Sequence, residues 1–155
     1  MYQETDRTTD HHPEIDMQLQ PYLFFNGSCE EALAYYKKTL GAEIVMLMRI
    51  KESPEPPTPG MLPPGSENKI MHATLRIGDV EFMASDGHCS GQPDFKGFSL
   101  SLTYPDAAKA NQAFAALAKQ GTVNMPIAKT FWSPCFGMVT DPLGVQWMIT
   151  VPHQA

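Results

Sequence analysis

Residues 21–43, PYLFFNGSCEEALAYYKKTLGAE, decide the fold because they contain a strand, a turn, a helix and the start of the next strand. Ser28 and Glu31 have the spacing of a capping box, in which each side chain bonds the backbone of the other residue at a helix start. This spacing predicts a helix over residues 29–40. Gly41 follows directly, and glycine commonly ends a helix in the left-handed conformation.

Strands are predicted on both sides of this helix. Residues 17–25 alternate in character, with Leu19, Leu23 and Phe25 on one face, which is typical of a strand. Residues 42–50 form a nearly continuous apolar run and predict a buried strand. Further strands are predicted over residues 69–77, 80–85, 98–103, 122–128, 136–140 and 145–151.

The same order of elements occurs twice along the chain. Asp106 is the predicted N-cap of a second helix, and Gly121 is its predicted end, as Gly41 is for the first. One helix for four strands does not fit a doubly wound fold, in which helices alternate with parallel strands. The sequence therefore predicts an α+β fold of two βαβββ modules. The predicted divisions are a polar N-terminal tail (1–16), a first module (17–86) and a second module (97–152).

The composition excludes several classes of protein. The 155 residues have a formal net charge of −6, and no run of Lys and Arg is available to bind nucleic-acid phosphates. No apolar run approaches the roughly 18 residues that a membrane-spanning helix needs. The cysteines are odd in number and widely spaced, which indicates free thiols and a cytoplasmic protein. Only 18% of the residues are charged, which suggests that apolar surface is hidden in a cavity or a subunit interface.

Three stretches carry a resemblance to a known family. They are residues 21–43, residues 70–86 (IMHATLRIGDVEFMASD) and residues 130–149 (TFWSPCFGMVTDPLGVQWMI). The chain from about residue 17 to 151 resembles the PhnB-like proteins of the vicinal oxygen chelate superfamily, which includes glyoxalase I, bleomycin-resistance proteins and extradiol dioxygenases. This group also carries the label 3-demethylubiquinone-9 3-methyltransferase-like. The chain has no glycine-rich loop between a strand and a helix for S-adenosylmethionine, so the sequence gives no support to methyl transfer.

The resemblance implies that the two modules form a cup of curved mixed sheets and that the chain is a homodimer. Metal-using relatives hold a divalent ion in this cup with His, Gln or Glu side chains. The cup-facing positions of this chain are Gln18, Gln20, Tyr22, Phe24, Glu81, Met83, Ser85, Ser99, Ser101, Thr103, Gln146, Met148 and Thr150. Met148 stands where a final Glu ligand is expected, and the fifth strand offers only hydroxyls. We therefore predict no metal site and no cofactor.

His72 is the candidate for a chemical role. It alternates with Thr74 and Arg76 and so faces the cup. An imidazole there could act as a base or bind a ligand, and the alternative is a structural histidine held by hydrogen bonds. Arg76 could bind an anionic group with its planar fork, and the alternative is an ion pair with Glu81 across the hairpin.

The remaining candidates are large side chains that could form the wall of a pocket: Tyr22, Phe24, Trp132 and Met148. Phe131 and Trp132 could line a pocket mouth or a dimer contact, and the sequence does not choose between the two. Trp147 shares its face with Val145 and Ile149, so we expect it in the core.

Three functions remain open. The leading hypothesis is a protein that binds a small molecule, or a metal-independent enzyme, with His72 as the polar group of an apolar cup. One alternative is a metal-dependent lyase or dioxygenase that uses Gln20, His72 and carboxylates such as Glu81 or Asp86. The other alternative is a dimer with a purely structural role.

Overall fold

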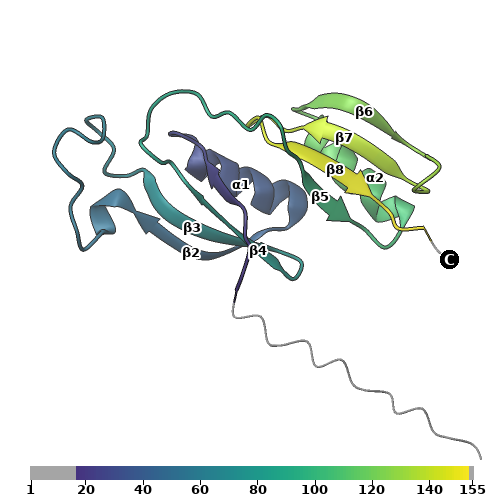
Figure 1. The fold of residues 1–155 in the computed structure, drawn as a ribbon, viewed down its shortest axis with the longest axis horizontal. Helices are drawn as coiled ribbons and strands as arrows, with labels where there is room; N and C mark the ends of the chain where they lie inside the picture. Colours follow the sequence, from purple (N-terminus) through teal and green to yellow (C-terminus); the bar gives the residue numbers. More distant parts are fainter. Residues whose placement is uncertain (1–16, 154–155) are drawn as a thin grey trace, which may run out of the picture.

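A computed structural model of the chain describes residues 17–153. The predicted tail, residues 1–16, lies outside the described residues. Two four-stranded sheets, each with one helix, lie side by side along the long axis of the molecule (Figure 1). The structure thus confirms an α+β fold of two βαβββ modules. Neither helix of the described part has the length and apolar content needed to cross a membrane.

The first sheet, which we call sheet A, has the strand order β1-β4-β3-β2. Strand β1 pairs in parallel with β4, and the other two pairings are antiparallel. Helix α1 covers one face of this sheet through an apolar core. The bounds are β1 (Tyr22–Phe24), α1 (Cys29–Leu40), β2 (Glu43–Arg49), a 3-10 turn (Ile50–Glu52), β3 (Ile70–Ile77) and β4 (Val80–Ser85).

The second sheet, sheet B, repeats this arrangement with the order β5-β8-β7-β6. Strand β5 is parallel to β8, as β1 is to β4, and helix α2 contacts β6, β7 and β8. The bounds are β5 (Leu100–Thr103), α2 (Ala107–Ala118), β6 (Thr122–Ala128), β7 (Phe136–Thr140) and β8 (Gln146–Thr150). The two sheets are separate and do not close on each other within the described chain.

Helix α1 begins differently from the sequence prediction. Ser28 makes no capping bond with its side chain. The buried carboxylate of Asp86 instead accepts the backbone N–H groups of Gly27 and Cys29, each at 2.8 Å, and that of Ile70 at 2.8 Å. The predicted capping box is therefore wrong, because a carboxylate distant in sequence satisfies the N–H groups at the helix start.

The other helix ends follow the sequence more closely. Gly41 ends α1 in the left-handed conformation, with φ of 66°. Asp106 caps α2 by accepting the N–H of Lys109 at 2.9 Å, as predicted. Gly121 has a different role from Gly41: a Cβ atom there would lie 2.3 Å from the carbonyl oxygen of Thr140. Its lack of a side chain allows close approach between the α2–β6 connection and the end of β7.

Strand β1 is shorter than predicted. The alternation over residues 17–25 suggested a long strand, but only Tyr22–Phe24 pair with β4. Pro21 has no N–H to donate, and the register of Tyr22 with Met83 places Val80, the first residue of β4, opposite Leu19, so residues 17 and 18 have no partner on this strand. Residues 17–19 are exposed.

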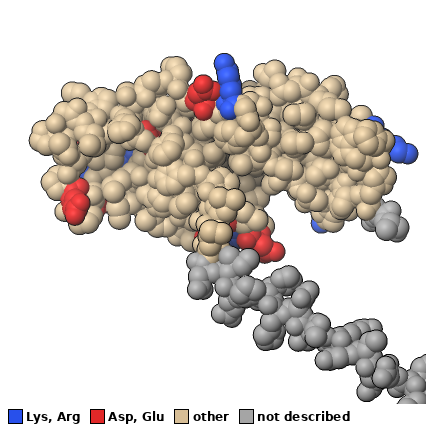
Figure 2. All heavy atoms as spheres, in the orientation of Figure 1, with Lys and Arg blue, Asp and Glu red and all other residues tan. Residues whose placement is uncertain are grey.

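Strand β2 is an exposed edge, which corrects the prediction of a buried strand over residues 42–50. The strand order places β2 at the outer edge of sheet A. Its apolar side chains Ile44, Val45, Met46 and Leu47 are consequently exposed on both faces of the sheet. Charged groups are sparse over the molecular face drawn in Figure 2, in keeping with the low charged fraction of the sequence.

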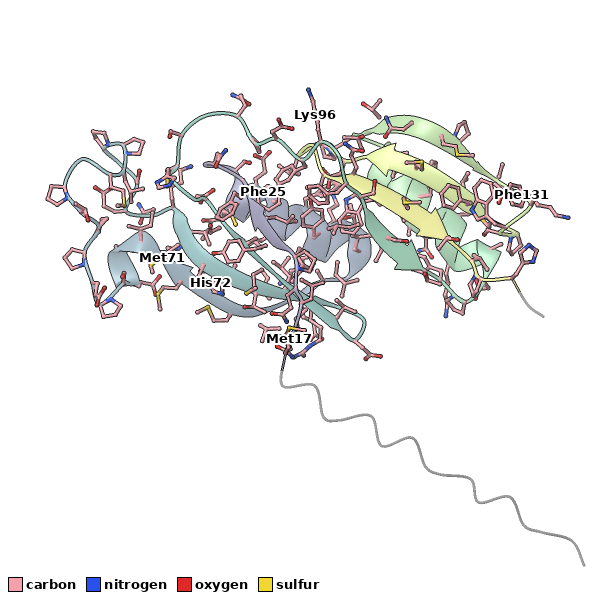
Figure 3. All side chains as sticks on the ribbon, in the orientation of Figure 1. Met17, Phe25, Met71, His72, Lys96 and Phe131 are labelled. Atoms are coloured by element: carbon pink, nitrogen blue, oxygen red, sulfur yellow. The ribbon has the colours of Figure 1, made fainter. Side chains whose placement is uncertain are left out.

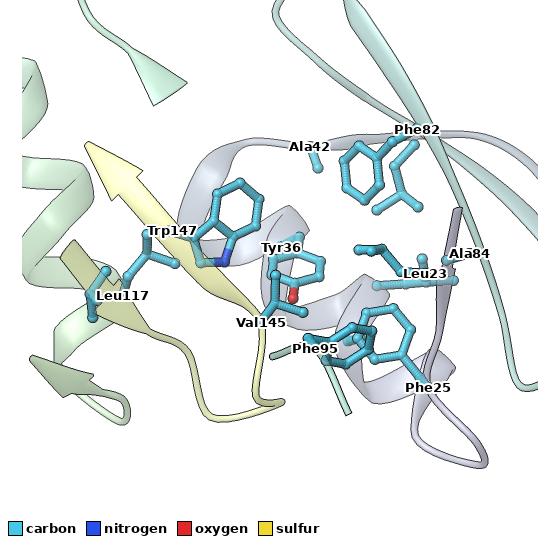
Figure 4. Close-up of a cluster of buried hydrophobic side chains, with 14 of the residues drawn as sticks. Leu23, Phe25, Tyr36, Ala42, Phe82, Ala84, Phe95, Leu117, Val145 and Trp147 are labelled. Atoms are coloured by element: carbon cyan, nitrogen blue, oxygen red, sulfur yellow. The ribbon is translucent and has the colours of Figure 1, made fainter. Parts of the chain in front are cut away.

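The core is continuous across the two modules. Trp147 of β8 is buried, as predicted, and its ring lies 5.6 Å from that of Tyr36 on α1 (Figure 4). The Tyr36 ring also contacts Phe82 of β4 at 6.4 Å, and Phe25 contacts Phe95 at 5.2 Å. These aromatic contacts join elements of both modules to the loop between them.

Candidate functional site

The candidate site lies on the face of sheet A turned away from α1, which we call the open face. Core-facing residues such as Leu23, Ala73 and Leu75 are fully buried, whereas the alternate residues on β1, β3 and β4 are mostly half-exposed. This alternation matches the parity that the sequence predicted. The open face is therefore available for interactions that the core-facing residues cannot make.

The strand register arranges the open face in rows that cross the sheet. The first row is charged and contains Glu81, Arg76 and Glu43. The second row contains Tyr22, Met83, Thr74 and Met46. The third contains the pairs Phe24–Ser85 and His72–Met48. Neighbouring rows are about 7 Å apart, because they are separated by two residues along a strand.

Tyr22, Phe24 and His72 form an aromatic cluster across the second and third rows. The Tyr22 hydroxyl lies 3.1 Å from His72 Nδ1, and their ring centroids are 5.5 Å apart. The Tyr22 and Phe24 rings are 4.9 Å apart. The hydroxyl of Thr74 lies 3.5 Å from His72 Nε2, so both ring nitrogens have a neighbour. The structure thus brings together three of the predicted site residues on one face.

Arg76 lies at the charged end of the same face. Its guanidinium pairs with Glu81 at 2.8 Å and with Glu43 at 3.4 Å, and these hydrogen bonds raise its pKa. The predicted ion pair across the hairpin is therefore present. A depression of about 610 Å³ adjoins this end, lined by Gln18, Leu19, Gln20, Arg76, Asp79, Val80 and Glu81.

Trp132 and Met148 lie in the other module. Met148 is on the face of sheet B turned away from α2, in a row with Ser101, Met138 and Met125. Trp132 is 46% exposed and packs edge-to-face on Phe131 and Phe136. His72 and Phe131, the neighbour of Trp132, lie in opposite halves of the molecule (Figure 3). The structure therefore does not bring Trp132 to the His72 cluster within one chain.

A groove between the modules was not predicted from the sequence. It has a volume of about 640 Å³ and is lined by Pro21, Leu40, Ile77, Gly78, Asp79, Val80, Phe82, Leu100, Ser101, Leu102, Thr103, Tyr104 and Trp147. It lies between the turn of the β3–β4 hairpin and the edge strand β5. No sequence pattern could have found this groove, because it depends on how the two modules pack.

The residues present do not fit the divalent ion that metal-using relatives hold. Within residues 17–153, no three His, Cys, Asp or Glu side chains lie close enough together to hold a metal ion. His72 has Tyr22 and Thr74 at its ring nitrogens, and the nearest open-face carboxylates pair with Arg76. The metal-dependent alternative therefore lacks a ligand set in the described part of one chain.

The three cysteines are unpaired and poorly suited to nucleophilic chemistry. Burial raises the pKa of Cys29, and the nearby Asp86 carboxylate raises it further. Burial also raises the pKa of Cys89 and of Cys135. Since the thiolate is the reactive form, these thiols are weak nucleophiles at neutral pH.

Comparison with known proteins places this geometry in a family. The model of the Glyoxalase/Bleomycin resistance protein/Dioxygenase superfamily matches residues 18–149. Protein YjdN of Escherichia coli (strain K12) is 38% identical over 143 residues, which are 89% of this chain and 97% of the relative. The structure of protein PA1353 from Pseudomonas aeruginosa is 40% identical with a TM-score of 0.77, covering 89% of this chain and 99% of that one.

A second solved structure bears on the predicted resemblance to PhnB-like proteins. It is described as a putative 3-demethylubiquinone-9 3-methyltransferase, PhnB protein, from Bacillus cereus. It is 28% identical with a TM-score of 0.72, and the match covers 87% of this chain and 99% of that one. The resemblance is confirmed, and the chain belongs to the glyoxalase/bleomycin resistance protein/dioxygenase superfamily.

Proposed function

We propose that the chain binds an amphipathic small molecule on the open face of sheet A. The observation that carries this proposal is the cluster of Tyr22, Phe24 and His72, which places aromatic surface and a polar ring on a face outside the core. Apolar and aromatic walls with a few convergent polar groups are typical of small-molecule sites. Aromatic rings also offer large contact areas, which dominate binding energies.

Methionines extend the apolar wall around this cluster. Met83 and Met46 share the second row with Tyr22, and Met48 lies opposite His72. Methionine side chains are unbranched and polarisable, so they adapt to ligands of different shape. Flexible side chains of this kind are better suited to binding a ligand than to a reaction that needs rigidly placed groups.

His72 is the polar group that would orient the ligand. Its bond to the Tyr22 hydroxyl limits rotation of the imidazole ring, and Thr74 lies beside the other nitrogen. A ligand could replace Thr74 as the partner of Nε2, since 3.5 Å is a long hydrogen bond. The same group would serve as the base if a metal-independent reaction takes place on this face.

The proposal includes a homodimer in the cytoplasm. A small-molecule site normally encloses most of its ligand, whereas the open face of one chain is a single wall. A second copy would supply the opposite wall, and the exposed apolar strand β2 supports such an association. The free thiols support a reducing compartment. Sedimentation equilibrium of the full chain tests the dimer, and a monomer at micromolar concentration would contradict it.

The binding proposal can be tested with the neutral fluorescent probe N-phenyl-1-naphthylamine. Phe24→Ala should weaken binding of the probe about tenfold, because an aromatic contact and its buried area are lost. Phe98→Ala is the matched control, since Phe98 is 45% exposed, Phe24 is 51% exposed, and Phe98 lies outside the open face. Equal affinities of the two variants would contradict the proposed site.

A further inference from the structure

We propose that the ligand of the open face is a small organic cation, with its positive charge about one row spacing, roughly 7 Å, from an aromatic or apolar group. This inference rests on the proposed function and specifies the chemical class of the ligand. It is drawn from the charges in the first row, the depression beside them and the aromatic cluster in the next rows.

The charged end of the face has an excess of negative charge. Arg76 contributes the positive charge, and both of its terminal nitrogens are already engaged, Nη1 by Glu43 and Nη2 by Glu81. Asp79, in the β3–β4 turn, borders the same depression as Arg76 and Glu81. Among the described residues, this end of the face therefore carries one guanidinium and three carboxylates, so an added cation would be attracted there and an added anion repelled.

This geometry changes the interpretation of Arg76. An arginine that recognises a carboxylate or phosphate of a ligand presents two parallel N–H groups to it. The Nη1 and Nη2 atoms of Arg76 instead bind two different carboxylates of its own chain. The geometry favours Arg76 as the residue that holds Glu43 and Glu81 in place, and it does not favour the anion-binding role considered from the sequence.

Neutral groups at the depression also suit an ammonium ion. Gln18 and Gln20 line it, and each side-chain amide carries a carbonyl oxygen that can accept a hydrogen bond. An ammonium group has three N–H donors and no acceptor, so carboxylates and amide oxygens complement it fully. A neutral or anionic head group would leave part of this acceptor set without a donor.

The aromatic cluster determines where the ligand should carry an aromatic group relative to its positive charge. Tyr22 stands one row beyond Arg76 and Glu81, and Phe24 stands one row further. An aromatic group of the ligand that packs on these rings would therefore lie about 7–14 Å from the carboxylates, measured along the strands. An arylalkylamine with a linker of a few methylene groups spans the shorter of these distances.

The inference is tested with three ligands that share a phenyl group and a four-carbon chain and carry a cationic, a neutral or an anionic head group: 4-phenylbutylamine, 4-phenylbutan-1-ol and 4-phenylbutyrate. Calorimetric titration of the full chain at pH 7 and low salt should rank the amine first, the alcohol second and the carboxylate last. We expect the amine to bind at least about tenfold more tightly than the carboxylate, and the difference to shrink with added salt.

Three variants test whether the charges at the first row cause the tighter binding of the amine. Glu81→Gln and Asp79→Asn should each weaken amine binding about threefold to fivefold, which is the range for partly exposed charges, and should weaken binding of the alcohol less than binding of the amine. Arg76→Gln should strengthen amine binding by a similar factor, because removal of a positive charge from this end outweighs the loss of the ion pairs that hold Glu43 and Glu81 in place. Glu31→Gln is the matched control, since Glu31 is exposed on α1, on the other side of the sheet.

The outcomes separate this inference from the proposed function. Tighter binding of 4-phenylbutyrate than of the amine, or weaker amine binding by Arg76→Gln, would overturn the cation preference. Neither result would contradict the proposed small-molecule site on the open face. Binding of all three ligands with equal affinity would have the same consequence. A failure of all three ligands to bind at millimolar concentration would overturn the inference together with the proposed site.

Discussion

Tyr36 and Asp141 are 105 residues apart in the sequence, yet the Tyr36 hydroxyl donates a hydrogen bond to Asp141 Oδ2 at 2.5 Å. The same oxygen accepts the Trp147 indole N–H at 2.9 Å. Asp141 Oδ1 accepts the backbone N–H groups of Leu143 and Val145 at 2.8 and 3.0 Å. This buried carboxylate therefore holds the β7–β8 turn in shape and also ties α1 of the first module to the second module.

We expect Tyr36→Phe to lower the free energy of unfolding by about 1–3 kcal/mol, because Asp141 would lose a donor in a buried position. Tyr35→Phe is the matched control, since the Tyr35 hydroxyl donates only a long bond, 3.4 Å, to the Leu117 carbonyl. Urea denaturation at pH 7 measures both variants. Equal losses for the two would show that the bond to Asp141 has no special role.

The same bond predicts an alkaline limit of stability. Burial and the Asp141 carboxylate raise the pKa of Tyr36 well above its usual value. A raised pKa in the folded state means that the stabilisation is complete below the pKa of an unfolded tyrosine, about 10, and is lost as the pH rises above it. Burial also raises the pKa of Tyr35, to about 12, so both tyrosines contribute.

The free energy of unfolding should therefore fall between about pH 9.5 and 11, and the fall should be shallower in Tyr36→Phe than in the unchanged chain. Chemical denaturation at several pH values in this range gives both slopes. Identical slopes would mean that Tyr36 titrates normally in the folded protein.

Asp86→Ala should cost about 3 kcal/mol or more, because the backbone N–H groups of Gly27, Cys29 and Ile70 would lose a charged acceptor. Ser28→Ala should cost less than about 1 kcal/mol, since Ser28 makes no capping bond. Thermal or urea unfolding of the two variants decides which residue caps α1. A larger loss for Ser28→Ala would restore the capping box that the sequence suggested.

The two glycines after the helices should respond differently to alanine. Gly41→Ala should cost about 1–2 kcal/mol, the strain of a left-handed backbone at a non-glycine residue. Gly121→Ala should cost more, because its Cβ would meet the backbone oxygens of Thr140 at 2.3 Å and Leu117 at 2.6 Å. Backbone atoms cannot rotate away as a flexible side chain can. Comparable unfolding midpoints for the two variants would contradict this distinction.

Patterns in the sequence predicted the features that depend on residues close together in the chain. The alternation of side chains placed Tyr22, Phe24 and His72 on one face, and the tight turn at Gly78 predicted the ion pair of Arg76 with Glu81. Both depend on residues that are neighbours along a strand or across a hairpin. The repeat of the βαβββ order likewise reflects local helix and strand signals in each half.

Relationships between distant segments were not predicted. Asp86 replaces the local cap of α1, and Asp141 bonds Tyr36, because the fold brings together groups that the sequence separates. Strand β2 has the composition of a buried strand, but the strand order places it at an edge. Trp132 and Met148 of the second module were assigned to the same cup as His72, but the packing of the modules keeps His72 and Phe131, the neighbour of Trp132, in opposite halves of one chain (Figure 3).

Binding on the open face is tested most directly by methyl NMR of the full chain labelled at its methionines. Met83 and Met46 lie in the second row, Met148 and Met138 on sheet B, and Met61 in the loop after β2. On titration with neutral 4-phenylbutan-1-ol, we predict saturable shifts at Met83 and Met46 and none at Met61. Shifts confined to Met148 and Met138, or no saturable shift at any methionine, would contradict a small-molecule site on the open face of sheet A.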